Sequence, residues 1–267
     1  MSDSQSLTAA EIKSIIDTAN AMADVAREVI LPRFRSNSLV PENKSLHSFD
    51  PVTDADKDAE KVMISELKKR RPTDGVFGEE FGELNGESLY RWVLDPIDGT
   101  RAFIAGAPTW GVLISLEKIG AGPIFGIIDQ PYIGERFFGG LGLAEYKKRD
   151  ESIKLKTSNV EEIENAILLS TFPEIGTEKD RKAFERVSEN VKLTRYGFDC
   201  YGYALVAMGT ADLVIEAGLS IYDIQAPACV IEAAGGLVTN WDGKPASNGG
   251  RITVSYTHLT LPTKRIV

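Results

Sequence analysis

The stretch from Trp92 to Thr100 constrains the fold more than any other part of this sequence. It reads W-V-L-D-P-I-D-G-T, so an apolar run typical of a buried strand leads directly into two carboxylates, Asp95 and Asp98. Carboxylates are rarely buried unless they are paired or bind a metal ion. The intervening proline fixes one backbone torsion and Gly99 permits an unusual one, so both carboxylates and the Ile97 carbonyl can face one point. Such oxygen ligands suit Mg²⁺ or Mn²⁺, while the alternative is an acidic turn that binds nothing.

Composition excludes several functional classes. The chain has 267 residues, 43% hydrophobic and 26% charged, which is enough for one large domain or two closely packed halves. A net charge of −9 offers no basic face for nucleic acid, and no apolar run approaches the ~20 residues of a membrane span. The N-terminus lacks the pattern of a signal peptide. The two cysteines, Cys200 and Cys229, have apolar or aromatic neighbours, so we expect a cytoplasmic protein with buried free thiols.

The residues around the central stretch predict an α+β half that extends from about residue 1 to 145. Apolar residues at helical intervals predict a helix from Thr8 to about Phe34, and Thr8 and Glu11 have the spacing of a capping box. A second helix is expected over 57–71. The central strand should be followed by an antiparallel meander with strands at 110–117, 123–130 and 135–138.

The second half, from about residue 150 to 254, alternates strands and helices, which argues for an α/β layer. The charged cluster at 147–150 has the character of a solvated loop, and we take it as the join between the halves. The predicted strands of this half are 166–170, 193–196, 211–216 and 237–241, and the predicted helices are 178–190, 201–209 and 223–234.

Further acidic residues stand where they could reach the two central carboxylates. Asp50, Asp54 and Asp56 precede a helix, where capping and the helix dipole favour acids. That preference explains one or two of them, so we expect at least one to be catalytic. Asp223 stands at another helix start, either as an N-cap or as a ligand that the second half brings to the first. Glu216, at a strand end, should face the same cleft.

With these residues assembled, the sequence resembles the inositol monophosphatase superfamily of Mg²⁺-dependent phosphomonoesterases over about residues 8–254. The resemblance is carried by Gly78-Glu79-Glu80, Asp95-Pro96-Ile97-Asp98-Gly99-Thr100, and Tyr222-Asp223 leading into Glu232-Ala233-Ala234-Gly235-Gly236. Within the superfamily it is most similar to bacterial histidinol-phosphatases, through the runs R-A-F-I-A-G from 101, G-F-D-C-Y-G-Y-A from 197 and D-I-Q-A-P from 223. The resemblance implies an α/β/α/β/α sandwich with a larger antiparallel sheet and a smaller mixed sheet, and it implies a homodimer.

The resemblance also implies a role for each site residue. Two or three Mg²⁺ ions, for which Mn²⁺ can substitute, would be bound by Glu79, Asp95, the Ile97 carbonyl, Asp98 and Asp223. The catalytic residues would be Asp56, Thr100 and Glu79, with Asp56 and Thr100 orienting and deprotonating the attacking water. The substrate would contact Asp98, Gly99, Thr100, Asp199, Glu216 and Asp223. Of these, the Gly99 and Thr100 amides would hold phosphate, and Asp199 and Glu216 would contact the rest of the substrate. Asp50 would lie in the outer shell of the metal site.

The implied function is hydrolysis of a small phosphate monoester by metal-activated water. L-histidinol phosphate is favoured, because the carboxylates of the substrate pocket suit a cationic amino alcohol. The alternatives are inositol 1-phosphate, a sugar phosphate or a 3′-phosphonucleotide. A non-catalytic metal-binding scaffold is disfavoured because no metal ligand is missing. The two histidines, His47 and His258, lie outside these motifs, so a phosphohistidine intermediate is not expected.

The last thirteen residues, 255–267, depart from the family. They read S-Y-T-H-L-T-L-P-T-K-R-I-V and show neither an amphipathic helix nor a core pattern, whereas the family continues with a small-residue turn and a last apolar element. We therefore expect the phosphatase unit to end near Val254, and our hypothesis is that the tail is not native sequence. Finding the same thirteen residues encoded in the source genome would refute it.

Overall fold

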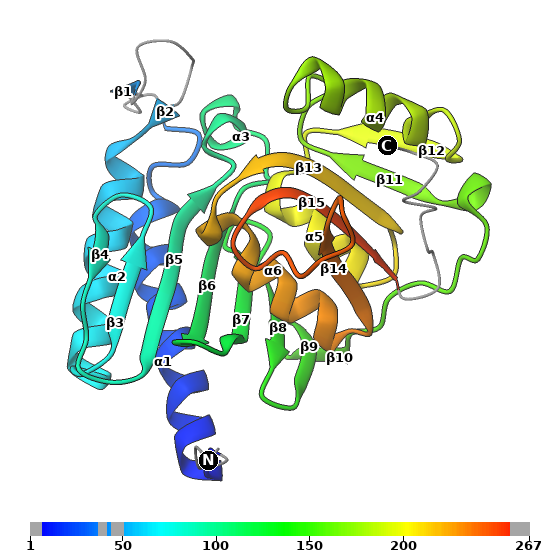
Figure 1. The fold of residues 1–267 in the computed structure, drawn as a ribbon. Coiled ribbons are helices and arrows are strands. Elements are labelled where there is room, and N and C mark those ends of the chain that lie inside the picture. Colours follow the sequence, from blue (N-terminus) through cyan, green and yellow to red (C-terminus); the bar gives the residue numbers. More distant parts are fainter. Residues whose placement is uncertain (1–6, 37–41, 44–50, 257–267) are drawn as a thin grey trace.

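The computed structural model describes residues 7–36, 42–43 and 51–256. In this part of the chain two β-sheets alternate with three layers of helices, which confirms the expected α/β/α/β/α sandwich (Figure 1). One layer, α1 (Ala9–Ile30) and α2 (Asp54–Arg70), covers a face of the larger sheet. A second, α5 (Asp199–Ala207) and α6 (Ile221–Ala233), lies between the sheets. The third, α4 (Glu178–Ser188), covers the far face of the smaller sheet.

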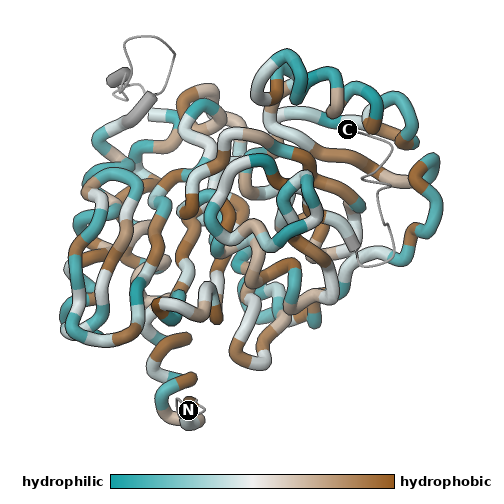
Figure 2. The backbone as a smooth tube through the Cα atoms, viewed as in Figure 1, coloured by the Kyte–Doolittle hydropathy of each residue, from teal (hydrophilic) through white to brown (hydrophobic). Residues whose placement is uncertain are grey.

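Hydrophobic residues are concentrated along the strands and on the helix faces that meet them (Figure 2). The largest side chains of the core, among them Trp92, Trp110 and Phe103, are fully buried between the larger sheet and the helices α1 and α2. By contrast, α4 is mainly hydrophilic and buries only a narrow apolar stripe that includes Phe184 and Val187. None of the helices in the described residues is both long enough and apolar enough to cross a membrane.

Capping residues set the starts of the first two helices. Thr8 caps α1 as predicted: the Glu11 amide donates to the Thr8 hydroxyl (3.2 Å) and the Thr8 amide donates to the Glu11 carboxylate (2.8 Å). The helix ends at Ile30, earlier than expected. Helix α2 begins at Asp54 rather than at residue 57, because Thr53 forms a second capping box with Asp56. Asp56 is therefore a first-turn residue of α2.

The larger sheet has eight strands in the order β10-β9-β8-β7-β6-β5-β3-β4, antiparallel except for the parallel pair β3 and β5. Its strands are β3 (Gly75–Gly78), β4 (Gly82–Leu84), β5 (Tyr90–Asp98), β6 (Gly111–Lys118), β7 (Gly122–Gln130), β8 (Glu135–Gly140), β9 (Leu143–Lys148) and β10 (Glu151–Lys154). The loop expected at 147–150 is wrong: Lys147 and Lys148 belong to β9 and pair with β10, and only Arg149 and Asp150 form the turn. The exposed edge strand β10 lacks the apolar alternation that marks a strand in sequence.

The smaller sheet has five strands in the order β12-β11-β13-β15-β14, with parallel β11, β12 and β13. Its strands are β11 (Ile167–Ser170), β12 (Leu193–Tyr196), β13 (Leu213–Leu219), β14 (Gly236–Asn240) and β15 (Gly250–Tyr256). Strand β15 continues two residues into the segment that the sequence set apart as a tail. Ser255 is buried there and pairs with Leu213 and Leu237, whereas 257–267 lie outside the described residues. Strands β1 (Glu42–Asn43) and β2 (Pro51–Val52) form a separate pair, and α3 (Thr100–Ala105) and a 3₁₀ turn (Ile163–Asn165) complete the elements.

Two glycines let α6 lie directly on the larger sheet. A Cβ atom added at Gly139 would lie 2.2 Å from the Cys229 carbonyl oxygen, and one added at Gly126 would lie 2.6 Å from that of Ala226. The helix is also tied to β6 by Gln225, which donates to Glu117 (2.6 Å) and accepts from Ser115 (3.0 Å). This close packing of α6 on the larger sheet fixes the position of its N-terminus between the two sheets.

Candidate active site

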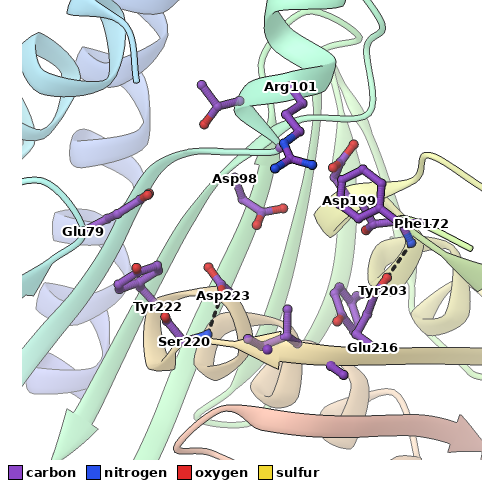
Figure 3. Close-up of a pocket in the computed structure, with 16 residues that line it drawn as sticks. Glu79, Asp98, Arg101, Phe172, Asp199, Tyr203, Glu216, Ser220, Tyr222 and Asp223 are labelled. Atoms are coloured by element: carbon purple, nitrogen blue, oxygen red, sulfur yellow. Dashed lines mark hydrogen bonds between the residues drawn. The ribbon is translucent and has the colours of Figure 1, made fainter. Parts of the chain in front are cut away.

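Element ends from both halves of the chain converge on one cavity of about 420 Å³ (Figure 3). The end of β5 and the start of α3 come from the first half. The second half contributes the starts of α5 and α6 and the end of β13. Five carboxylates line the cavity: Glu79, Asp98, Asp199, Glu216 and Asp223. The sequence predicted a site role for all five.

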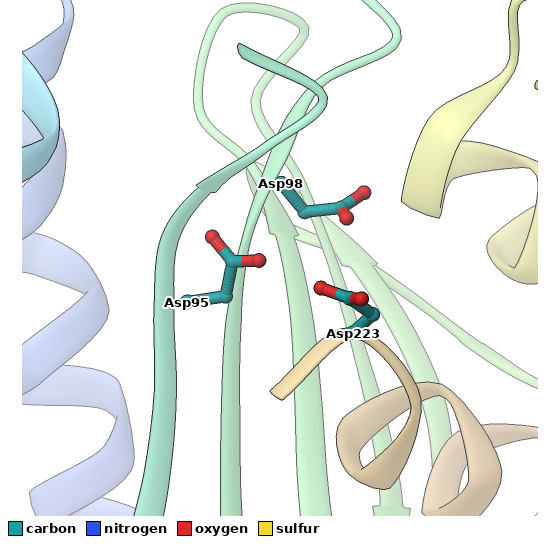
Figure 4. Close-up of side chains that lie close together, drawn as sticks. All are labelled: Asp95, Asp98 and Asp223. Atoms are coloured by element: carbon teal, nitrogen blue, oxygen red, sulfur yellow. The ribbon is translucent and has the colours of Figure 1, made fainter. Parts of the chain in front are cut away.

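Three of the predicted metal ligands form a cluster (Figure 4), and two of them, Asp98 and Asp223, line this cavity. Asp95, Asp98 and Asp223 each place one carboxylate oxygen so that the three atoms lie within 4.8 Å of one another. A backbone amide fixes each carboxylate: Ile97 donates to Asp95 (3.0 Å), Cys200 to Asp98 (2.6 Å) and Ser220 to Asp223 (2.6 Å). Asp223 is thus the third residue of α6 in a capping box with Ser220, and it is not the N-cap itself.

Repulsion among these carboxylates indicates that the cluster favours a positively charged ligand. Burial, followed by the charges of Glu79 and Asp98, raises the pKa of Asp95 well above its usual range. Burial and the charge of Asp223 do the same to the pKa of Asp98, and burial raises the pKa of Asp223 to about 7. Held this close, the three groups need either shared protons or a cation. Converging carboxylate oxygens are the donor set that Mg²⁺ prefers, so the residues fit a divalent metal ion.

Glu79, a further predicted metal ligand, lies in the turn after β3 and lines the same cavity, although it is not one of the three clustered carboxylates. A buried side chain holds this turn. Glu60 accepts hydrogen bonds from the amides of Glu80 (2.8 Å) and Phe81 (3.0 Å). A Cβ at Gly78 would lie only 1.9 Å from a Glu60 carboxylate oxygen, so the glycine makes this approach possible. The sequence analysis missed Glu60. The sequence does contain an indication of its role, because Glu60 places a carboxylate on the apolar face of α2, in helical register with buried Met63.

Asp56 and Thr100 come together as predicted, although they belong to different elements. The Thr100 hydroxyl lies 3.4 Å from an Asp56 carboxylate oxygen and 3.2 Å from the Ile97 carbonyl oxygen. The other Asp56 oxygen accepts from the Thr53 amide and hydroxyl (2.8 and 2.6 Å), which fixes the carboxylate. Burial raises the pKa of Asp56 to about 6. A group with this pKa can take up a proton near neutral pH.

Asp199 and Gly99 pack against each other in unusual backbone conformations. Gly99 has φ 86° and Asp199 has φ 45°, and a Cβ at Gly99 would lie 2.8 Å from the Asp199 side chain. A non-glycine residue in the left-handed region is strained, and such strain is concentrated at functional sites. The Asp199 carboxylate accepts from the Thr109 hydroxyl (2.9 Å), and burial raises its pKa.

Glu216 lies on the opposite wall of the cavity from Glu79 (Figure 3). It is buried near the end of β13, and one of its oxygens accepts from the Thr171 amide at 2.6 Å. Burial raises the pKa of Glu216 to about 7, and the charge of Asp199 adds to this effect. Asp199 and Glu216 both line the cavity and are not among the three clustered carboxylates, and we refer to this pair as the acidic wall.

The cavity has further lining residues to which the sequence analysis gave no role. Arg101 packs its guanidinium over the Phe172 ring at 4.9 Å, so that the two halves meet at the pocket mouth. Tyr203 lies between Asp199 and Glu216 (Figure 3). Arg101 and Tyr203 were part of the histidinol-phosphatase resemblance, which was the available signal. Asp50 lies outside the described residues.

Comparisons with known proteins agree with this geometry. Residues 11–267 match the inositol monophosphatase family. The chain is 42% identical over 240 residues to the chloroplastic bifunctional phosphatase IMPL2 of Arabidopsis thaliana, covering 89% of this chain and 67% of that protein. It is 33% identical over 247 residues to a histidinol-phosphatase of Streptomyces coelicolor, covering 90% and 92%. A solved inositol monophosphatase from Zymomonas mobilis superposes with a TM-score of 0.82 at 34% identity, over 97% of this chain and 99% of that one.

The family match spans both halves that build the cavity, and the solved relative shares their arrangement. Members of the family are metal-dependent hydrolases of small phosphate monoesters. The chain therefore belongs to the inositol monophosphatase family, and it is a phosphoric monoester hydrolase.

Proposed function

We propose that this phosphatase hydrolyses L-histidinol phosphate to L-histidinol and phosphate. The observation that carries the proposal is the acidic wall of Asp199 and Glu216, two carboxylates that line the cavity and are not part of the metal cluster. A carboxylate buried in such a wall favours a cationic partner, and L-histidinol phosphate carries an ammonium group close to its phosphate ester. Relatives named histidinol-phosphatase that match most of the chain support the same substrate.

The metal site of the proposal uses the residues predicted from the sequence. Two or three Mg²⁺ ions, or Mn²⁺ in their place, would be held by Glu79, Asp95, the Ile97 carbonyl, Asp98 and Asp223. When bound, such ions neutralise the phosphate and lower the pKa of a bound water.

The remaining roles fall to the chain itself. Thr53 fixes the Asp56 carboxylate, which accepts a proton from the attacking water. The proton passes to Asp56 either directly or by way of the neighbouring Thr100 hydroxyl. The amides of Gly99 and Thr100 hold phosphate oxygens at the start of α3. Because Gly99 has a left-handed backbone and packs against Asp199, the phosphate loop and the acidic wall are positioned together.

A second candidate substrate is a neutral polyol ester such as inositol 1-phosphate. Relatives named inositol-1-monophosphatase favour it, and the wall carboxylates can also accept hydrogen bonds from hydroxyl groups. The family resemblance further predicts a homodimer, which light scattering of the purified protein checks.

The deciding experiment measures phosphate release from L-histidinol phosphate and from myo-inositol 1-phosphate, with Mg²⁺ and with EDTA. We expect a clear preference in kcat/KM for the histidinol ester, and loss of both activities in EDTA. The matched variant Glu216→Gln should lose most of this preference. A wild-type preference for the inositol ester would overturn the substrate assignment and leave the metal site standing. Activity that survives EDTA would overturn the metal site.

A further inference from the structure

One polar group in the cavity has no partner. The side chain of Tyr203 is 4% exposed, and its hydroxyl makes no hydrogen bond within the described residues. A buried hydroxyl that is left unpaired costs stability, so buried hydroxyls nearly always find a partner. The Tyr203 residue nevertheless lines the cavity. A ligand bound in the cavity would therefore supply the hydrogen-bond partner that this hydroxyl lacks.

The surroundings of the ring keep the hydroxyl in this position. Tyr203 belongs to the core cluster between the two sheets, together with Leu113 and Val214, so its ring cannot leave the pocket without opening the core. Among the charged groups near the hydroxyl, Glu216 has the strongest influence, ahead of Asp98 and Asp223. The hydroxyl thus lies among the carboxylates of the cavity, and Glu216 of the acidic wall has the largest effect on it.

We propose that the Tyr203 hydroxyl oxygen binds the ammonium group of the substrate together with the carboxylates of Asp199 and Glu216. This inference rests on the proposed function, because it assigns a part of the same substrate. A primary ammonium group has three N–H donors, and these three side chains supply three acceptors. Tyr203 would therefore be a specificity residue that contacts the substrate beside the reacting ester.

A hydroxyl suits the third position better than a further carboxylate does. Burial and the neighbouring carboxylates hold the pKa of Tyr203 well above its usual range, so the group stays neutral. It adds an acceptor to the wall without adding another negative charge to the repulsion between Asp199 and Glu216. The tyrosine ring also covers one side of the pocket, so that the ammonium group binds away from water.

The test uses Tyr203→Phe, which removes one oxygen atom and retains the ring. It compares L-histidinol phosphate with 3-(imidazol-4-yl)propyl phosphate, the same ester without the amine. We expect the ratio of the two kcat/KM values to fall about tenfold in the variant, mainly through KM of the amine-bearing ester. Without substrate, the variant should melt at or above the wild-type temperature, because an unpaired hydroxyl has been removed.

The control is Tyr201→Phe on the same helix. The Tyr201 hydroxyl donates to Glu135 at 2.6 Å, so its loss should lower the melting temperature and preserve the ratio between the esters. If Tyr203→Phe lowers both kcat/KM values equally, or melts early as Tyr201→Phe should, the hydroxyl is structural and the inference is wrong. A wild-type enzyme without preference for the amine-bearing ester would overturn the proposed function, and the inference with it. A wild-type preference that Tyr203→Phe retains would overturn the inference alone.

Discussion

At the residue scale, Asp98 connects the metal cluster to the substrate side of the cavity. It shares the cluster with Asp95 and Asp223, and the Cys200 amide on α5 fixes its orientation. Replacing it by asparagine removes the charge and retains the size. We expect Asp98→Asn to lower kcat by about two orders of magnitude or more, as removal of one electrostatic group at a reacting centre does. Circular dichroism should show a native fold, and near-normal turnover would contradict the metal assignment.

The acidic wall should make substrate binding depend on pH. Burial raises the pKa of Glu216 to about 7, so the carboxylate gains its charge as the pH rises through 7 and loses it below. Attraction for a cationic substrate is therefore present above pH 7 and lost towards pH 6. We expect KM for L-histidinol phosphate to fall from pH 6 to 8 in the wild type. Glu216→Gln controls for titration of the substrate itself and should remove the part of the slope that Glu216 causes. Identical profiles for the two proteins would show that Glu216 does not bind the amine.

Glu60 should act on the metal site through the turn that carries Glu79. Its carboxylate accepts two amide hydrogen bonds, and a glutamine offers one oxygen in the same space. We expect Glu60→Gln to raise the Mg²⁺ concentration for half-maximal activity about tenfold, in the range that supporting residues of metal ligands show. The control is Glu66→Gln on the same helix, where exposed ion pairs with Lys69 and Arg70 contribute little. A lower kcat with unchanged Mg²⁺ dependence would argue against the positioning role.

The sequence predicted the charged residues of the site better than its neutral ones. Asp95 and Asp98 are visible because a short motif places both acids at the end of one strand. The role of Tyr203 depends on a packing detail: the residue is buried, yet it lines the cavity and its hydroxyl has no partner within the described residues. No local pattern distinguishes such a tyrosine from Tyr201, whose hydroxyl donates to Glu135 and which does not line the cavity.

At the element scale, α6 is the helix that joins the sheet to the site. Its close seat on Gly139 places Asp223 at the cluster. An added methyl group at Gly139 would meet the helix backbone, which cannot move aside locally. We expect Gly139→Ala to lower the free energy of unfolding by about 2 kcal/mol or more, in the range of overpacked cores, and to lower kcat as well because Asp223 shifts.

The matched control for this change is Gly142→Ala. Gly142 has φ 85° and open space around its Cβ position, so the variant should lose only about 1 kcal/mol to backbone strain. Urea unfolding and turnover measured on both variants separate the two effects. If both variants lose the same stability and both keep the wild-type kcat, the close packing of α6 on Gly139 does not position Asp223.

The main strands and helices were predicted from the sequence, and the charged hairpin at the sheet edge was not. Strand β6 differs from the prediction by one residue at each end, and β7 differs by one residue at its start. The β9–β10 hairpin was missed because its charged residues carry no period-2 pattern on an edge that faces water. The true start of α2 was hidden for another reason: the acids before residue 57 were taken to precede the helix, whereas Asp54 and Asp56 lie in its first turn and Asp56 completes the capping box of Thr53.

At the scale of the whole molecule, the site exists only where the two halves meet. Asp95 and Asp98 come from the larger sheet, while Asp223 and the acidic wall come from the second half. Periodicity predicted the meander and the alternating half, but the order of the layers came from the family resemblance. Layer order depends on which faces pack over long sequence separations, and neither composition nor spacing encodes that directly.

A bound metal ion should therefore hold the two halves together. Without it, the carboxylates of Asp95 and Asp98 repel that of Asp223 across the cavity, and a divalent ion replaces this repulsion by attraction to both halves. A ligand at about 100 times its Kd stabilises the folded state by about 2.7 kcal/mol, which is a rise of roughly 5–10 °C in melting temperature for a chain of this size. We expect Mg²⁺ to produce such a rise over EDTA, measured by calorimetry with and without the ion. Asp98→Asn should show a much smaller rise, although its melting temperature in EDTA should equal or exceed that of the wild type because one repelling charge is gone. The same rise in both proteins would place the stabilising ion elsewhere, and no rise in the wild type would mean that the cluster does not bind Mg²⁺ in the folded protein.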